Sequence, residues 1–149
     1  MVPKSDAKKM LVMKFGGTSV GSAKALAQAM DIVESNRPNW THMVVLVSAL
    51  SGTTNLLLDS AIEAARGKKD AYLKAEAELR SRHMAMAEAF LSPGDRQEKF
   101  RVAMDGLINE FSRFCQAITV LGEATPRALD AVAGLGERLS ARLFASALQ

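Results

Sequence analysis

Residues 10–21 read MLVMKFGGTSVG, and this stretch decides the fold class. Its first six residues are apolar except for Lys14, and two glycines follow at once, a pattern typical of a buried strand that enters a tight turn. Thr18 and Ser19 are suited to cap the next helix, whose apolar residues recur at helical spacing until Pro38. The stretch therefore predicts a strand, a glycine turn and a helix.

A second strand is predicted over residues 42–48, HMVVLVS. Its central run, 43–47, is apolar without alternation, which favours a parallel strand that is buried on both faces. Two such strands joined by a helix of this length form one right-handed βαβ unit. The fold class predicted from these elements is α/β.

The remainder of the chain is helical by pattern. Residues 72–91 and 95–121 are expected to form a two-helix hairpin, because Ser-Pro-Gly separates them. Leu135-Gly136-Glu137 is expected to interrupt the last helix. The predicted helices outside the βαβ unit cover residues 56–66, 72–91, 95–121 and, with that interruption, 127–149.

Composition excludes several classes of protein. Hydrophobic residues make up 48% of the chain and charged residues 23%, which is a normal globular balance, and the net charge of +3 is spread without a basic block. We therefore expect no nucleic-acid partner. No apolar run approaches the roughly 20 residues of a membrane span, so no membrane partner is expected either, and a cytoplasmic location fits.

Cysteine and histidine give no sign of a metal site. Cys115 is the single cysteine and sits among apolar residues of a predicted helix, so it is interpreted as a buried core thiol. His42 opens a strand and His83 lies in a charged helix, without a second ligand at metal spacing. Both are expected at the surface or at a strand edge.

The first motif that can carry chemistry is Lys14 to Gly21, KFGGTSVG. Glycines let backbone N–H groups approach an anion, a helix N-terminus adds partial positive charge, and Lys14 adds a full one. Together they suit a phosphate that gains charge during transfer. The string fits neither GxGxxG nor GxxxxGK[ST], and a plain strand-to-helix turn is the alternative.

Two further motifs follow. The second motif, residues 48–55 (SALSGTTN), offers hydroxyls and an amide that can hold a small molecule or a carboxylate, or it is simply a polar loop with an N-cap. The third motif, residues 134–140 (GLGERLS), places Glu137 after a glycine turn. Its carboxylate can bind a substrate ammonium, or it can be a first-turn Glu favoured by the helix dipole.

In combination, the three motifs resemble those of the aspartokinases, within the amino-acid kinase superfamily. KFGGTSVG, VVLVSALSGTTNLL (44–57) and LGERLS (135–140) occur in the same order. The helical stretch and the phrase ITVLGEATPRALD (118–130) resemble the subgroup that carries a helical insertion. The resemblance covers about residues 10–149.

The resemblance implies a three-layer amino-acid-kinase (carbamate-kinase-like) α/β fold. In this division residues 1–9 are a leader, residues 10–149 are the N-terminal portion of the kinase domain, and about 70–121 is a largely helical insertion. The implied reaction converts ATP and L-aspartate into 4-phospho-L-aspartate and ADP, with Mg²⁺ accompanying ATP. This reaction opens the synthesis of lysine, threonine and methionine.

The family's functional residues map onto the three motifs. The resemblance implies that Lys14 is the catalytic residue, that the transferring phosphate is held by Lys14, Gly16, Gly17 and Thr18, and that aspartate is bound by Ser48, Thr54 and Glu137. Glu137 would take the amino group. No metal ligand is implied within this chain.

The family's later GRGGSD-type loop, its adenine-binding segment and its C-terminal sensing domains have no counterpart here, and Gln149 falls inside a predicted helix. We therefore expect a truncated fold that continues in its natural form, with little or no activity alone. With two strands only, open sheet edges favour a homo-oligomer.

Three alternatives stay open on the sequence alone. One is another amino-acid kinase, acting on glutamate, acetylglutamate or carbamate. The second is a stand-alone binding or regulatory module that uses the kinase half-fold without catalysis. The third is a purely helical interaction domain. This hypothesis requires that all three glycine motifs are turns whose resemblance to functional motifs is coincidental.

Overall fold

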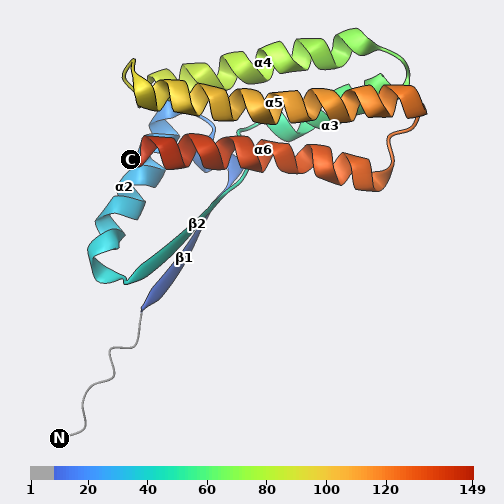
Figure 1. Cartoon of the computed structure of the whole chain (residues 1–149). Coiled ribbons are helices and arrows are strands. Elements are labelled where there is room, and N and C mark those ends of the chain that lie inside the picture. The colour runs from blue at the N-terminus through green and yellow to red at the C-terminus, as the bar shows by residue number, and fades with distance from the viewer. Residues whose placement is uncertain (1–8) are drawn as a thin grey trace, which may run out of the picture.

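Two parallel strands, β1 (Met10–Phe15) and β2 (His42–Val47), lie side by side in register (Figure 1). The computed structural model describes residues 9–149, so the predicted leader lies outside the described residues except for Lys9. The Lys9 carbonyl accepts the N–H groups of Thr41 (3.0 Å) and His42 (3.1 Å). Both predicted strands are confirmed, and the hydrogen bonds between the two chain segments begin at the Lys9 carbonyl.

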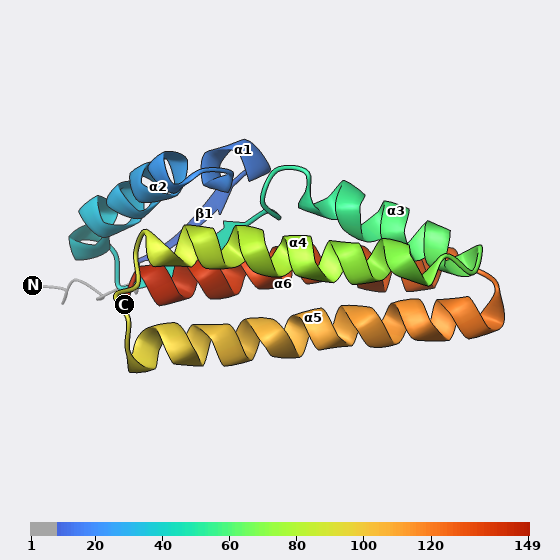
Figure 2. The same ribbon diagram turned by 90° about the horizontal axis from the view of Figure 1, so that it is seen from above.

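The connection between the strands contains α1 (Gly17–Val20), α2 (Ala23–Asn36) and the 3₁₀ turn η1 (Arg37–Asn39) (Figure 2). The prediction of one helix capped by Thr18 and Ser19 is wrong. Ser22 caps α2 instead, its Oγ accepting the Ala25 N–H at 3.2 Å. The helix is divided at Gly21, where a Cβ would lie 2.7 Å from the Ser51 hydroxyl oxygen.

The rest of the chain forms four helices that run alongside one another (Figures 1 and 2). They are α3 (Thr53–Ala65), α4 (Lys69–Glu88), α5 (Asp95–Leu121) and α6 (Pro126–Ala147). The predicted hairpin of α4 and α5 is confirmed. Within residues 9–149, none of the helices combines the length and the apolarity that a membrane crossing requires.

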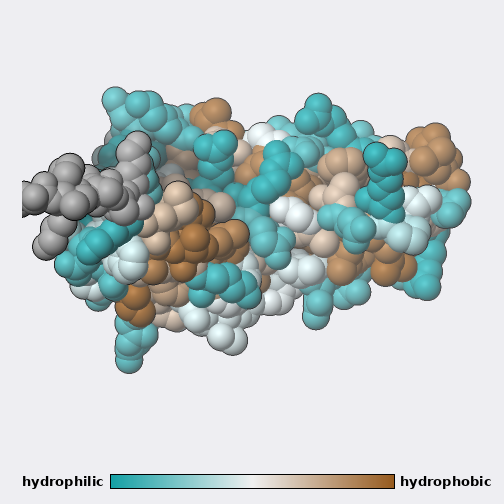
Figure 3. Space-filling model, turned by 90° about the horizontal axis from the view of Figure 1, so that it is seen from below, coloured by the Kyte–Doolittle hydropathy of each residue, from teal (hydrophilic) through white to brown (hydrophobic). Residues whose placement is uncertain are grey.

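Within residues 9–149 the sheet is covered on one face only, contrary to the prediction of burial on both faces. On the covered face the Phe15 ring stacks on Phe144 of α6, with centroids 5.9 Å apart. On the open face four apolar side chains are exposed by 44% to 59%: Met10, Val12, Val44 and Leu46. Figure 3 shows a brown, apolar patch on the side of the molecule that is seen from below. The strands are apolar on both faces, but the helices of the described chain pack on one.

Helix α6 runs without a break from Pro126 to Ala147, so the predicted interruption at residues 135–137 is wrong. Gly134 and Gly136 both lie inside it with helical backbone. Glycine inside a helix is destabilising by roughly 1 kcal/mol relative to alanine. A glycine in a helix is therefore expected where close packing leaves no room for a side chain, and Gly136 is packed in this way against the loop after β2.

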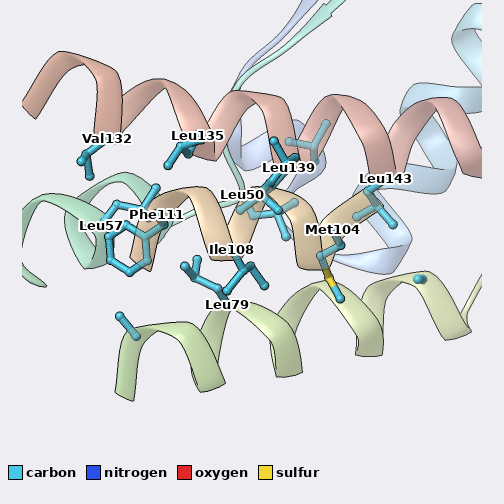
Figure 4. Packing of buried hydrophobic residues seen from close by; sticks show 14 of the residues in the cluster. Leu50, Leu57, Leu79, Met104, Ile108, Phe111, Val132, Leu135, Leu139 and Leu143 are labelled. Atoms are coloured by element: carbon cyan, nitrogen blue, oxygen red, sulfur yellow. The ribbon is translucent and has the colours of Figure 1, made fainter. Parts of the chain in front are cut away.

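The core is continuous from the sheet into the helices. Figure 4 shows Phe111 of α5 together with Leu57, Leu135 and Leu139 in the interior between the helices. Leu50, from the loop after β2, belongs to the same buried cluster and is 5% exposed. The segment that carries the second motif is thus anchored in the helical core.

Cys115 lies in this core, as predicted, and its side chain is fully buried. Burial raises the pKa of the thiol to about 12, and the nearby Glu76 carboxylate adds to the shift. At neutral pH the group is therefore a neutral thiol, which is a poor nucleophile and a poor metal ligand.

His83 is fully buried in α4, so the prediction of a surface histidine is wrong. Its Nδ1 lies 2.8 Å from the Leu79 carbonyl oxygen and donates to it, whereas Nε2 is buried without a hydrogen-bond partner in the described structure. The pKa of His83 is lowered because burial disfavours the charged ring, and the Arg82 charge acts in the same direction.

We expect this histidine to make stability depend on pH. Below about pH 6.5 the unfolded chain takes up a proton on residue 83, while the folded chain does so only at lower pH because its pKa is lowered. The free energy of unfolding should therefore fall with pH below about 6.5, by at most about 1.4 kcal/mol per pH unit. Urea unfolding at about pH 7.5 and about pH 5.5 measures this.

The variant His83→Gln is the control, because its amide can still donate to Leu79 but does not titrate. It should show a smaller loss of stability between the two pH values than the wild-type protein. An equal loss in both proteins would assign the pH dependence to other groups.

Candidate functional site

The first and second motifs are in direct contact. The Ser51 hydroxyl donates to the Gly17 carbonyl oxygen at 3.2 Å. A Cβ on Gly17 would lie 2.9 Å from the Ala49 carbonyl oxygen, closer than side-chain carbons come to backbone. The close approach of these two backbone segments requires glycine at position 17, and it shows that the ends of the two parallel strands bring the motifs together.

The second and third motifs are joined in the interior. The Leu50 N–H donates to the Ser140 hydroxyl oxygen at 3.0 Å, and both residues are buried. A Cβ on Gly136 would lie 2.8 Å from the Ala49 Cβ and 3.5 Å from Thr53 Cγ2. Gly136 is therefore needed so that α6 can approach the loop after β2, and it does not form a turn.

Glu137 is an exposed side chain far inside α6, so it is neither next to a glycine turn nor in a first helical turn. It makes no ion pair or side-chain hydrogen bond within residues 9–149. The neighbouring Arg138, in contrast, pairs with Glu110 of α5 at 2.7 Å. That pairing lowers the pKa of Glu110. The carboxylate of Glu137 is therefore exposed at the surface of α6 and has no charged partner within residues 9–149.

Lys14 leaves β1 on the open face of the sheet, opposite Leu46 in the strand register, and is exposed. The described structure gives it no ion pair. Within residues 9–149, Lys14 and Glu137 form neither an ion pair nor a side-chain hydrogen bond with each other.

The other predicted residues surround the same strand ends. Gly16 is half-buried, with open space where a Cβ would be, and Thr18 is exposed. Ser48 and Thr54 are half-buried. Because α1 has only four residues, the first motif lacks the dipole of a long helix, and an anion there would depend on Lys14 and on backbone N–H groups.

A hollow of about 250 Å³ opens beside the first motif. It is bounded by Thr18 and Ser19 on one side and by Gln28 and Ile32 of α2 on the other, with Phe15 at the strand end. No group of three or more His, Cys, Asp or Glu side chains suited to a metal ion occurs in the described part of the chain.

Sequence reasoning missed the residues that join the motifs. Ser51 and Ser140 lay inside the quoted strings, but neither was singled out. One signal was present for Ser140: it follows Gly136 by four residues, one helical turn, so both lie on the same face of a continuous helix. The assumed interruption at residues 135–137 concealed that spacing.

As a whole, the arrangement suits recognition of a small zwitterion next to an anion. A lone carboxylate can take an ammonium group, the hydroxyls of Ser48 and Thr54 can take a carboxylate, and Lys14 with adjacent backbone N–H groups can take a phosphate. All three lie at the carboxyl ends of the strands, where open α/β sheets bind ligands.

Comparison with known proteins gives one family. The sequence model of the amino acid kinase family matches residues 9–149. The chain is 32% identical over 148 residues to the chloroplastic bifunctional aspartokinase/homoserine dehydrogenase 1 of Arabidopsis thaliana, covering 99% of this chain and 16% of that protein. It is also 32% identical over 155 residues to the aspartokinase of Schizosaccharomyces pombe, covering 99% of this chain and 29% of that one.

Solved structures that are similar to this chain belong to the same kind of protein. Aspartokinase III of E. coli in complex with aspartate and ADP superposes with a TM-score of 0.72 at 26% identity, over 94% of this chain and 29% of that one. The same enzyme in complex with lysine and aspartate gives a TM-score of 0.75 at 25% identity, over 93% and 28%. The chain thus spans less than a third of the length of these relatives.

Proposed function

The chain belongs to the amino acid kinase family, and from this premise we propose that it supplies the aspartate-binding part of an aspartate kinase. The observation that carries the proposal is the junction of the three motifs: Ser51 joins the second motif to the first, and Leu50 joins it to the third. The crystallised relative whose fold it shares was solved with aspartate and ADP. A stand-alone binding module is not favoured, because the relatives are kinases.

In the proposed site Glu137 binds the ammonium group of L-aspartate, while Ser48 and Thr54 hold its carboxylate groups. The support is the exposure of the Glu137 side chain, the half-buried positions of Ser48 and Thr54 after the end of β2, and the hydrogen bond that links the loop after β2 to α6. An exposed, unpaired carboxylate is suited to an ammonium group, because each charge-assisted hydrogen bond contributes about 1.5–3 kcal/mol.

The phosphate side of the proposed site consists of Lys14, Gly16, Gly17 and Thr18. Lys14 would act as the catalytic residue by stabilising negative charge that develops on the transferring phosphate. ATP would be the phosphate donor, and Mg²⁺ would arrive with it, because this ion is usually held by substrate phosphates together with few protein ligands. The product would be 4-phospho-L-aspartate, an intermediate of lysine, threonine and methionine synthesis.

Two wider expectations accompany this function and stay predictions. The first is a cytoplasmic location, although the relatives from Arabidopsis thaliana and Zea mays are chloroplast proteins by name. The second is a homo-oligomer without nucleic-acid or membrane partners. We expect ligand binding by this chain without steady turnover, so a titration is a sharper test than a rate assay.

The test is an NMR titration of the ¹⁵N-labelled chain with L-aspartate, with separate titrations of D-aspartate and L-glutamate as controls. We expect selective shifts for L-aspartate at the amides of Ser48, Thr54 and Glu137. In Glu137→Ala the dissociation constant should rise about tenfold or more, because a hydrogen bond to a charged group is lost.

The matched control is Glu123→Ala, which removes the same charge from an exposed position between α5 and α6. It should leave the dissociation constant unchanged. Equal shifts for all three amino acids, or none at millimolar L-aspartate, would contradict the proposed function.

A further inference from the structure

The hydrogen bond between Leu50 and Ser140 connects segments that are ninety residues apart in the sequence. Ser140 is 2% exposed and Leu50 is 5% exposed, so water does not compete for the bond. We propose that Ser140 is a positioning residue: by accepting the Leu50 N–H, its hydroxyl oxygen fixes the second motif relative to Glu137. The consequence for aspartate rests on the function proposed above.

The Leu50 N–H has no place in the strand ladder, because β2 ends at Val47. A buried N–H without a partner is strongly unfavourable, so this bond limits the conformations open to the loop. The next contact in the loop, from the Thr53 N–H to the Leu50 carbonyl at 2.9 Å, passes the constraint on to the start of α3. Thr54 follows directly.

Ser140 and Glu137 are three residues apart in α6 and therefore lie on neighbouring positions of one helix side. A loop held at Ser140 is consequently held at a fixed offset from the Glu137 backbone. Gly136 keeps the same approach free of side-chain atoms. At the next residue of the loop, the Ser51 hydroxyl donates to the Gly17 carbonyl oxygen. By fixing the loop, Ser140 therefore also helps to fix the position of the first motif.

Ser60 provides a matched comparison for Ser140. It is also buried, at 5% exposure, but its hydroxyl donates to the Leu56 carbonyl at 2.6 Å within the same helix, α3. Replacing Ser60 by alanine thus removes a buried hydroxyl without separating two segments. Any effect that is seen at Ser140 but not at Ser60 reports the link between the second motif and α6.

The experiment compares wild type, Ser140→Ala, Ser140→Cys and Ser60→Ala by amide hydrogen exchange and by L-aspartate titration. We expect the Leu50 amide in Ser140→Ala to exchange at least about tenfold faster relative to the core amide of Leu79, because its partner is gone. The dissociation constant for L-aspartate should rise at least about fivefold. Ser140→Cys fills the volume with a weak acceptor and should share both defects. Ser60→Ala should share neither.

Two outcomes overturn the proposal: unchanged relative protection of Leu50 in Ser140→Ala, or unchanged affinity in a protein whose wild type binds L-aspartate. If the wild type shows no selective binding, the proposed function fails on its own. The exchange of Leu50 then still decides whether Ser140 positions the loop.

Discussion

We expect Gly136→Ala to lower the free energy of unfolding by about 1–3 kcal/mol, because the new Cβ overpacks a filled interior. It would lie 2.8 Å from the Ala49 Cβ, a group that cannot rotate away, and 3.4 Å from Leu57 Cδ1. Relief requires α6 to move away from the loop after β2. The better helix propensity of alanine offsets only part of this, roughly 1 kcal/mol.

Gly134→Ala is the matched control, because position 134 lies in the same helix and has no atom within 4 Å of a Cβ. Here only the propensity gain remains, so the free energy of unfolding should rise by roughly 0.5–1 kcal/mol. Urea unfolding followed by circular dichroism measures both changes. If the two variants were stabilised alike, α6 would not approach the loop as closely as the structure has it.

These two glycines also mark a limit of sequence reasoning. From the string GLGERLS a turn and a close approach are equally plausible, because both need a residue without a side chain. The difference lies in Ala49, which is remote in the sequence and contacts position 136 only after folding. Where local signals were sufficient, as in β1 and in α5 from Asp95 to Leu121, the predicted bounds agree with the structure.

The two faces of the sheet show a related limit. An unbroken apolar run in β2 indicates that both faces of the strand can be buried, but it does not indicate which elements cover them. In the described chain the helices pack against the face of Phe15, and the face of Val12 and Lys14 stays open. Coverage depends on which helices are present and where they pack.

His83 was misplaced although a signal for it was present. Buried residues of α4 recur every three or four positions, and His83 continues that series from Tyr72 and Leu79 to Ala87. The charged residues around it suggested a solvated helix. The helical spacing of the buried residues places position 83 on the inner face of α4. This spacing was the stronger physical indicator.

Within the candidate site, the sequence predicted which segments meet but not how they are held together. The three motifs were recognisable because their residue types suit phosphate and amino-acid recognition. Their junctions depend on Ser51 and Ser140, whose hydroxyls bind backbone groups remote in sequence. Such side-chain-to-backbone links leave no periodic pattern, so only the folded structure identifies them.

We expect Phe111→Ala to lower the free energy of unfolding by about 3–5 kcal/mol, through lost burial and the cavity left behind. Phe111 is 1% exposed and is the largest fully buried side chain in the described chain. Total stabilities of roughly 5–15 kcal/mol make such a loss a large fraction of the whole. Urea unfolding should be followed both by circular dichroism, which reports the helices, and by the fluorescence of Trp40, the single tryptophan.

The two signals report different parts of the molecule, because Trp40 lies next to the start of β2 while Phe111 lies in α5. Since one buried cluster runs from α2 through the helices, both transitions should shift together to lower urea. Phe114→Ala, at a half-buried position of the same helix, should produce a smaller shift in both. If circular dichroism shifted while Trp40 did not, the predicted insertion at about residues 70–121 would unfold as a separate unit. The helices would then not stabilise the strands that carry the candidate site.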